Sequence, residues 1–162
     1  MTMTPDPDRA TLLFDLVADR RRWAAEGRTL VLTNGCFDLL HPGHVTLLEA
    51  ARAEGDRLVV AINSDRSVRE IKGEGRPLTP EVERAEALRA LECVDRVVIY
   101  DEPTPAAIIE ALGPDVLVKG ADWALNDIVG RETVTRRGGR VVRVPLVAGQ
   151  STSGVVARIR RT

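Results

Sequence analysis

The chain has 162 residues, a formal net charge of −1 and only 3% aromatic residues, and its length fits one domain with a hydrophobic core. The basic residues are dispersed along a nearly neutral chain, so we expect no nucleic-acid partner. No apolar run has the length of a signal peptide or membrane span, and the two cysteines lack disulfide spacing, so we expect a cytoplasmic protein with no membrane partner.

The pattern of elements begins with an amphipathic helix and continues with alternating strands and helices. Within residues 8–26, apolar residues at helical spacing predict a helix that serves as scaffold or dimer surface: Leu12, Leu13, Leu16, Val17 and Trp23. We expect this N-terminal helix to occupy residues 1–27 and the main domain residues 28–162. Apolar runs predict strands at 29–33, 58–62, 97–99, 116–118 and 141–144. Helices are predicted at 42–53, near 65–70, from a cap at Thr79 to about 91, from 104, within 126–137 and from about 152.

The order of these elements predicts the fold class. The strands are continuous apolar runs, which is typical of strands buried on both faces. Five such strands separated by helices predict a single Rossmann-like α/β domain with a doubly wound, five-stranded parallel sheet. Ligands of such sheets bind beyond the carboxyl ends of the strands.

The stretch after the first strand, residues 35–44, contains both histidines of the chain, His41 and His44. Pro42 suits the first turn of the following helix, whose free N–H groups and positive dipole end make an anion site. Two imidazoles three residues apart share one helical face and can both donate hydrogen bonds to a phosphate. Surface histidines and a zinc site with Cys36 are the alternatives. Because there is no C-x-x-C pair and no evident third ligand, we expect no metal held by the protein alone.

The use of lysine is unusual in this arginine-rich chain. Of the 23 Lys and Arg residues only Lys72 and Lys119 are lysines, and each precedes a glycine. A compact ammonium is not interchangeable with a guanidinium where a point charge meets a phosphate in a tight space. The pattern therefore favours phosphate contacts for both, with ordinary solvated lysines as the alternative.

Several other chemistries lack their motifs. The chain contains neither a P-loop G-K-[ST] nor a dinucleotide-binding G-x-G-x-x-G, which argues against a P-loop kinase and an ordinary NAD enzyme. No residue is an evident covalent nucleophile, and we interpret Cys36 as a small packing residue of the loop.

The segment Thr33-Asn34-Gly35-Cys36-Phe37-Asp38, followed by His41-x-Gly43-His44, resembles the signature of the HxGH nucleotidyltransferases of the cytidylyltransferase-like superfamily. The nearer resemblance is to the D-glycero-D-manno-heptose 1-phosphate adenylyltransferases, which occur alone or as the C-terminal half of a fused kinase–adenylyltransferase. It extends over about residues 28–159, through segments 61–65, 72–77, 117–122 and 151–153. Because 162 residues are too few to include a sugar kinase, we expect the free-standing form.

The resemblance implies an enzyme that joins ATP and the heptose 1-phosphate to give ADP-heptose and pyrophosphate, for synthesis of lipopolysaccharide and other surface polysaccharides. It also implies magnesium, which bridges triphosphate oxygens, and a homodimer. One alternative is a related cytidylyltransferase acting on glycerol 3-phosphate or another phosphorylated alcohol. Another is a non-catalytic nucleotide sensor, which would tolerate loss of the histidines or Lys72.

Site residues follow from the resemblance together with the chemistry. Nucleotidyl transfer needs alignment and charge neutralisation rather than a general base, because the attacking phosphate is already an anion. His41, His44 and Lys72 are the predicted catalytic residues. Predicted nucleotide or phosphate contacts are Thr33, Asn34, Gly35, Cys36, Phe37, Gly43, Lys119, Gly120, Asp122, Ser151, Thr152 and Ser153. Predicted sugar-phosphate contacts are Asp38, Asn63, Asp65 and Arg76. For residues 151–153 a plain helix cap is the alternative.

Overall fold

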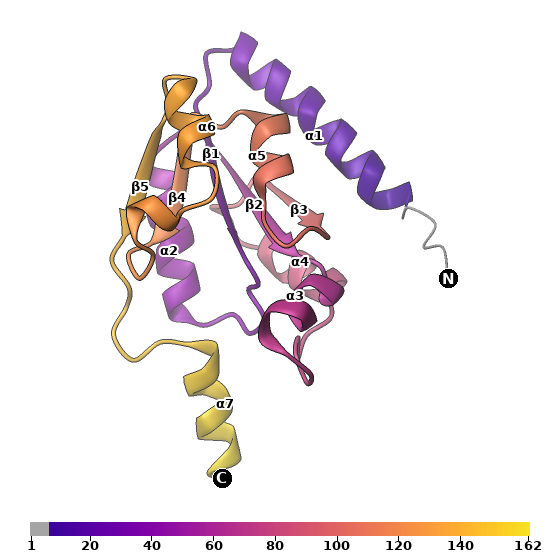
Figure 1. Ribbon diagram of the computed structural model, residues 1–162, viewed down its shortest axis with the longest axis vertical. Helices are drawn as coiled ribbons and strands as arrows, with labels where there is room; N and C mark the ends of the chain where they lie inside the picture. The colour runs from indigo at the N-terminus through magenta and orange to yellow at the C-terminus, as the bar shows by residue number, and fades with distance from the viewer. Residues whose placement is uncertain (1–6) are drawn as a thin grey trace.

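The structure, a computed structural model, describes the backbone of residues 7–162 and the side chains of residues 13–162. Its centre is a five-stranded sheet made of β1 (Leu30–Gly35), β2 (Arg57–Asn63), β3 (Arg96–Tyr100), β4 (Val116–Gly120) and β5 (Arg140–Val144). The strand order is β3-β2-β1-β4-β5 and every pair is parallel (Figure 1). The predicted doubly wound parallel sheet is confirmed, because the chain winds outward from β1 in both directions.

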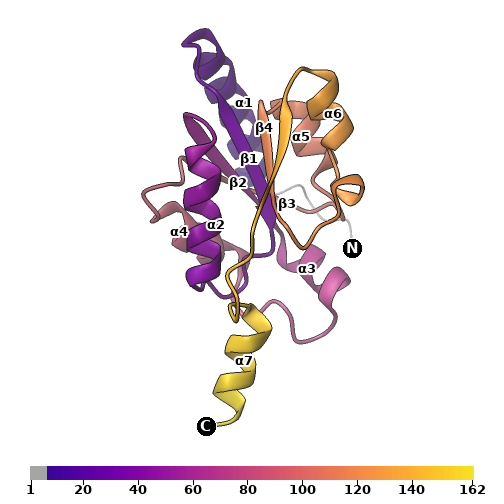
Figure 2. The ribbon, with the colours of Figure 1, turned by 90° about the vertical axis from the view of Figure 1, so that its left-hand side faces the viewer.

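Helices cover both faces of the sheet. They are α1 (Pro7–Ala25), α2 (Pro42–Ala53), α3 (Asp65–Lys72), α4 (Glu81–Arg89), α5 (Ala106–Leu112), α6 (Arg131–Arg136) and α7 (Thr152–Arg160), with a short 3-10 turn at Leu125–Asp127. Figure 2 shows α2 and α4 on one side of the strands and α5 and α6 on the other. The first helix, α1, packs on the side of α5, where its Trp23 shares a core with Ile109. The side chain of Leu12, predicted to pack in the first helix, lies outside the described residues.

Each side of the sheet has its own hydrophobic core. Leu48 of α2 and Leu88 of α4 pack on one side, and Trp23 of α1 and Ile109 of α5 pack on the other. In β2, residues 58–62 are all fully buried, as the continuous apolar run predicted.

One predicted helix boundary needs correction. Pro80, not Thr79, occupies the N-cap position of α4, and no side chain caps this helix. The backbone N–H of Thr79 instead donates to Asp38 Oδ1 (2.9 Å). The helix predicted within residues 126–137 is confirmed as α6, and Gly130, in a left-handed conformation, lies just before it.

The last helix stands apart from the others. Figures 1 and 2 both show α7 projecting from the end of the domain where the strands terminate. None of its residues is buried, and Ile159 near its end is exposed. Its first turn approaches the predicted phosphate loop, because Thr152 Oγ1 contacts the Leu39 carbonyl.

Candidate functional site

The loop between β1 and α2 is shaped by Phe37. Phe37 adopts a left-handed backbone conformation, with φ of 49°, and its side chain is buried. Its ring lies 5.0 Å from that of His44, centroid to centroid. A Cβ atom on Gly35 would approach the Phe37 ring to 3.0 Å, so the loop needs glycine there. The sequence thus folds locally so that an aromatic ring supports one of the two histidines.

The two histidines lie at the start of α2 and stack on one another. Their ring centroids are 3.8 Å apart with an interplanar angle of 21°. Nδ1 of each is buried without a hydrogen-bond partner among the described residues. At Gly43, a Cβ atom would come within 2.9 Å of the His41 ring and 3.0 Å of Gln150 Cβ. Gly43 therefore permits the segment before α7 to approach the histidines.

Burial keeps both imidazoles neutral. The pKa of His44 is lowered to about 4, mainly by burial and to a smaller extent by the adjacent His41. The Leu39 carbonyl acts in the opposite direction without making a hydrogen bond of acceptable geometry, so burial prevails. Burial and the charge of Arg158 also lower the pKa of His41. At neutral pH each ring therefore offers one N–H donor and carries no charge.

We expect the free energy of unfolding to fall as the pH is lowered from about 6.5 to about 4. In this window the unfolded chain protonates His44 at its ordinary pKa of 6.5, whereas the folded chain keeps it neutral down to about 4. Protonation then favours unfolding by roughly 2 kcal/mol, allowing for water around the half-buried ring. Urea denaturation at pH 7 and pH 4.5 tests this, and His44→Ala should lose less stability than the unchanged chain. Equal losses in both proteins would contradict the assignment.

The two lysines reach this loop from different elements. Lys72 is the last residue of α3, and its ammonium makes no hydrogen bond or ion pair with residues 13–162, although its charge acts on His44. Lys119, on β4, donates from Nζ to the Asn34 carbonyl (3.2 Å), and its Nζ lies 4.8 Å from the centre of the Trp123 ring. Burial lowers the pKa of Lys119. A half-buried ammonium without a carboxylate bonded to it is a candidate anion-binding group.

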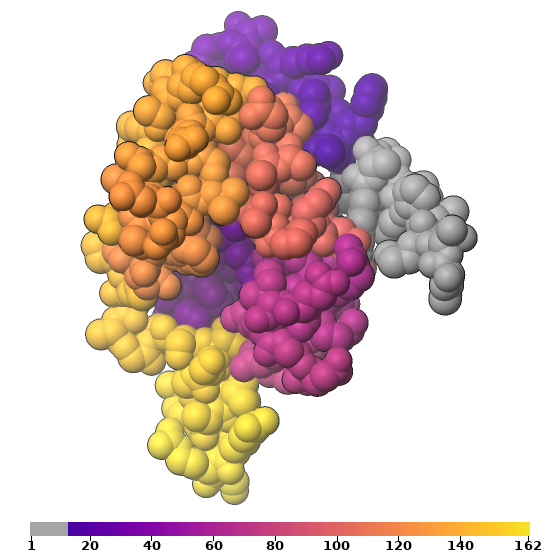
Figure 3. All heavy atoms as spheres, in the orientation of Figure 1, coloured from indigo at the N-terminus to yellow at the C-terminus, as the bar shows by residue number. Residues whose placement is uncertain are grey.

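Two adjacent hollows open where the strands end, with volumes of about 350 and 360 Å³. Figure 3 shows the depression between α3, the segment after β4 and the start of α7, with the β1–α2 loop at its floor. The first hollow extends over the ends of β2 and β3 to Asn63 and Tyr100. The second extends over the end of β4 and the starts of α2 and α7 to His41 and Asp122. Both hollows share nine lining residues: Asn34, Gly35, Cys36, Phe37, His44, Lys72, Lys119, Trp123 and Thr152.

The segment at the start of α7 faces the second hollow. Ser151 is the N-cap of α7, and its hydroxyl accepts a hydrogen bond from the Gly154 N–H (2.9 Å). Thr152 Oγ1 donates to the Leu39 carbonyl (3.4 Å). Thr33, Gly120 and Ser153 also line this hollow, although the Thr33 hydroxyl donates to the Val118 carbonyl (2.8 Å). A helix cap was the alternative to phosphate contact for residues 151–153, and Ser151 is such a cap while it also lines the second hollow.

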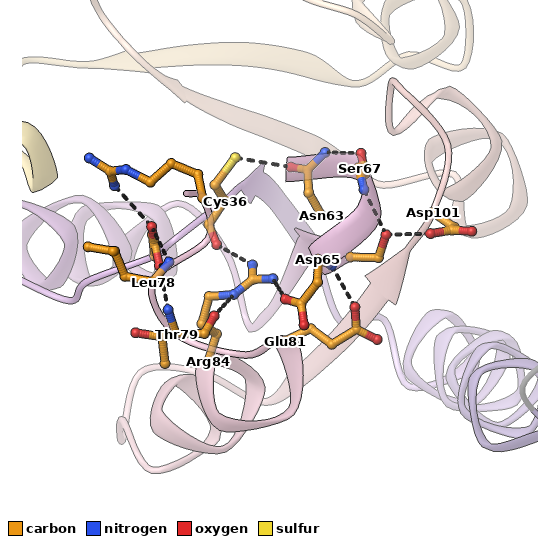
Figure 4. A network of polar contacts seen from close by, with 12 residues as sticks. Cys36, Asn63, Asp65, Ser67, Leu78, Thr79, Glu81, Arg84 and Asp101 are labelled. Atoms are coloured by element: carbon orange, nitrogen blue, oxygen red, sulfur yellow. Dashed lines mark hydrogen bonds and ion pairs between the residues drawn. The ribbon is translucent and has the colours of Figure 1, made fainter. Parts of the chain in front are cut away.

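All four residues predicted to contact the sugar phosphate have protein partners, and Asn63 pairs with Ser67 and Tyr100. Arg76 donates to Asp38 Oδ2 (3.0 Å), and the N–H groups of Leu78 and Thr79 donate to the same carboxylate (Figure 4). Burial raises the pKa of Asp38, but these donors more than reverse that effect and hold its pKa below the ordinary value. Asp65 pairs with Arg84. Asp65 and Arg76 line neither of the two hollows, so the structure does not bring them together with the histidines.

Arg84 is a buried residue of this region that the sequence reasoning missed. It is 1% exposed and donates to the Thr79 carbonyl (2.9 Å), the Cys36 carbonyl (2.6 Å) and Asp65 Oδ1 (2.8 Å) (Figure 4). It therefore connects α4 and α3 to the phosphate loop. The available signal was its position four residues before Leu88, which places an arginine on the apolar face of α4.

Comparison with known proteins identifies the family. The chain matches the family described as Cytidylyltransferase-like over residues 32–155, from β1 into α7. The chain belongs to this family. It is also similar to a solved structure, a lipopolysaccharide core biosynthesis protein from Thermoplasma volcanium. The TM-score is 0.61 at 27% identity, covering 74% of this chain and 97% of that one.

Curated relatives of the family are more similar in sequence. The chain is 59% identical over 138 residues to the bifunctional protein HldE of Azorhizobium caulinodans, covering 85% of this chain and 29% of that protein. It is 56% identical over 155 residues to the bifunctional protein HldE of Citrifermentans bemidjiense, covering 95% and 32%. The chain thus spans about a third of the length of these relatives or less. Their identity confirms the resemblance that the sequence predicted.

Two structural findings bear on metals and membranes. No group of three His, Cys, Asp or Glu side chains among the described residues lies close enough to hold a metal ion. No helix in the same part of the chain is long and apolar enough to cross a membrane.

Proposed function

We propose that the chain is an adenylyltransferase that joins ATP and D-glycero-D-manno-heptose 1-phosphate to give ADP-heptose and pyrophosphate. One observation carries this proposal: His44, Lys72 and Lys119 each line both hollows. Donors shared by two adjoining hollows suit a reaction in which a phosphate in one hollow attacks a phosphate in the other. Such a reaction requires alignment and charge neutralisation.

In this proposal the triphosphate occupies the second hollow and the sugar phosphate the first. The N-terminal ends of α2 and α7 both border the second hollow, and their free N–H groups favour an anion there. The sugar phosphate attacks the α-phosphorus with an oxygen that is already ionised. The bond from that phosphorus to the bridging oxygen breaks, and pyrophosphate leaves on the His41 side. His41 and His44 donate hydrogen bonds as charge develops on the leaving group.

The heptose assignment rests on the chain's relatives and on its motifs. The proteins similar to it over 85–95% of its length are named bifunctional protein HldE. The similar structure from Thermoplasma volcanium is named for lipopolysaccharide core biosynthesis. The segments that carry the nearer resemblance to heptose 1-phosphate adenylyltransferases include 117–122 and 151–153, and these segments border the second hollow. We also infer a homodimer in the cytoplasm, as the resemblance implies.

Magnesium fits this site as a companion of the triphosphate. Asp122 is the only carboxylate among the described residues that line the second hollow, and the Asp38 carboxylate is already saturated by protein donors. Magnesium commonly keeps several waters and binds through one or two carboxylates plus substrate phosphates. When bound, it would neutralise phosphate charge, with Asp122 as its nearest protein ligand. The protein's own donors would then complete the neutralisation.

A pyrophosphate-release assay tests the proposed function. Purified protein with magnesium is given ATP, CTP or GTP, each crossed with the heptose 1-phosphate, glycerol 3-phosphate and mannose 1-phosphate. We expect release with ATP and the heptose 1-phosphate. Release only with CTP and glycerol 3-phosphate would assign the chain to the cytidylyltransferase alternative. No release with any pair would favour a nucleotide sensor.

Lys72→Arg should impair the reaction although it keeps the charge. Lys72 ends α3 directly before Gly73, whose φ is 93°, and lines both hollows, where the broad guanidinium needs a different approach to phosphate. We expect kcat/KM to fall about 10-fold, roughly the effect of one lost charge-assisted contact. Arg69→Lys is the matched control, because Arg69 is exposed on the same helix and lines neither hollow. Full activity of Lys72→Arg at subsaturating ATP would return Lys72 to an ordinary solvated role.

A further inference from the structure

The floor of the first hollow contains a hydrogen-bonded row of polar side chains that the proposed reaction does not use. Asn34, Asn63 and Tyr100 lie at or next to the carboxyl ends of β1, β2 and β3, which are neighbours in the sheet. All three line the first hollow. Asn63 and Tyr100 are buried, at 4% and 3% exposed, whereas Asn34 is half-buried. Side chains placed in this way can select what the hollow binds.

The donor and acceptor of each hydrogen bond in this row of side chains follow from one backbone carbonyl. Ser67 Oγ lies 3.1 Å from the Glu102 carbonyl oxygen, which can only accept, so Ser67 donates its hydroxyl proton there. Ser67 Oγ must then accept from Asn63, whose Nδ2 is 3.0 Å away. This contact fixes the Asn63 amide and turns its Oδ1 toward Tyr100.

The same logic continues to Asn34. Burial raises the pKa of Tyr100, so the phenol keeps its proton at neutral pH. The Tyr100 hydroxyl donates to Asn63 Oδ1 at 3.1 Å, because a carbonyl oxygen only accepts. With its proton used, the hydroxyl can only accept from Asn34, whose Nδ2 lies 3.3 Å away. The Asn34 amide therefore has its N–H side directed to Tyr100.

This arrangement leaves Asn34 Oδ1 as an acceptor with a fixed orientation. No donor within residues 13–162 bonds to this atom, and it is not a buried atom left without a partner. An open amide carbonyl accepts a hydrogen bond from a hydroxyl but carries no charge to attract a cation. The Asn34 backbone carbonyl also accepts from Lys119, so the acceptor lies next to a proposed phosphate contact.

We propose that Asn34 is a specificity-determining residue whose Oδ1 accepts a hydrogen bond from a hydroxyl of the phosphorylated sugar, and that Tyr100 is the positioning residue that orients it. This inference rests on the proposed function, because it places the acceptor substrate in the first hollow. It moves Asn34 from the predicted nucleotide contacts to the acceptor. It also predicts selection for a phosphorylated polyol that presents an uncharged hydroxyl group to Asn34.

Two variants test the proposal with different readouts. Asn34→Ala removes the acceptor, and Tyr100→Phe keeps the ring but removes the hydroxyl that orients the amide. Each is assayed with the heptose 1-phosphate and with its 2-, 3- and 4-deoxy analogues. We expect the unchanged protein to discriminate against one analogue by about 10-fold in kcat/KM, the upper range for one neutral hydrogen bond. That discrimination should fall to within about 2-fold in Asn34→Ala and to about 3-fold in Tyr100→Phe.

Controls separate this role from a structural one. The KM for ATP should stay within about 2-fold in both variants, because only the acceptor loses a contact. Ile109→Val truncates a fully buried residue of α5 in the core that packs on the other side of the sheet from α2 and α4. Ile109→Val should lose about as much stability as Asn34→Ala and Tyr100→Phe, but it should keep the discrimination against the deoxy analogue. The kinetics of all three variants are measured at temperatures equally far below their own melting temperatures.

The outcomes distinguish the inference from the proposed function. If the unchanged protein uses the heptose 1-phosphate but both variants keep its discrimination, the inference is wrong and the proposed function stands. A rise in the KM for ATP alone would overturn the inference by returning Asn34 to the nucleotide. If the protein accepts another phosphorylated polyol, the proposed substrate is wrong, and the same comparison with deoxy analogues of that polyol decides the inference. No transfer to any acceptor would overturn both.

Discussion

His44→Ala should lower kcat by about 100- to 1,000-fold while changing ATP binding by only a few-fold. His44 is the one histidine that lines both hollows, so its N–H lies nearest to the point where the two phosphates meet. A donor whose contact strengthens only as charge develops stabilises the transition state more than the ground state. Loss of one such donor has an effect of this size. Steady-state kinetics with varied ATP, together with calorimetric binding of a non-hydrolysable ATP analogue, measure both parts.

The control for this variant is Thr46→Ala. Thr46 is exposed on α2, two residues after His44, and lines neither hollow. It should keep kcat within about 2-fold, because surface substitutions away from a site usually have small effects. If His44→Ala weakened ATP binding as strongly as it lowered kcat/KM, His44 would be a ground-state contact. An unchanged kcat would make it a surface or structural histidine, the alternative that the sequence left open.

Arg84→Met should reduce the free energy of unfolding by about 2 to 4 kcal/mol, because two backbone carbonyls lose their donor and the ion pair with the partly exposed Asp65 is lost. The side chain of Arg84 is fully buried, and methionine of similar length would leave the Thr79 and Cys36 carbonyls without their donor. Because the Cys36 carbonyl belongs to the phosphate loop, the variant should also lose activity under conditions where it remains folded. Urea denaturation and pyrophosphate release at low temperature measure the two effects separately.

Arg137→Met provides the matched control for burial. Arg137 also donates to a backbone carbonyl and a carboxylate, those of Glu110, at 3.1 and 2.7 Å, but it is exposed. Its replacement should lower the free energy of unfolding by less than about 1 kcal/mol, because exposed ion pairs contribute little. Equal losses for the two variants would show that the Arg84 contacts act as an ordinary surface pair.

The sequence by itself determined the sheet and the phosphate loop, because both depend on local signals. Each strand is a continuous apolar run, and the alternation with helices forces parallel pairing, so the architecture follows from patterns a few residues long. The grouping of His41 and His44 at the start of α2 also follows from local spacing, since both residues lie within four positions of the helix start. The same short motifs predicted the family, and the match over residues 32–155 confirms it.

Only the tertiary structure decided which polar side chains meet. Lys119 reaches Asn34 of β1 across 85 positions of the chain, and Arg84 reaches Cys36 across 48. The sequence placed Asp65 and Arg76 with the substrate, yet Asp65 pairs with Arg84 and Arg76 with Asp38. The orientation of the Asn34 amide depends on four successive hydrogen bonds, contributed by β1, β2, α3, β3 and the Glu102 carbonyl just after β3. A hydrogen-bond partner is selected by distance and angle in the folded chain, and residue spacing carries no information about either.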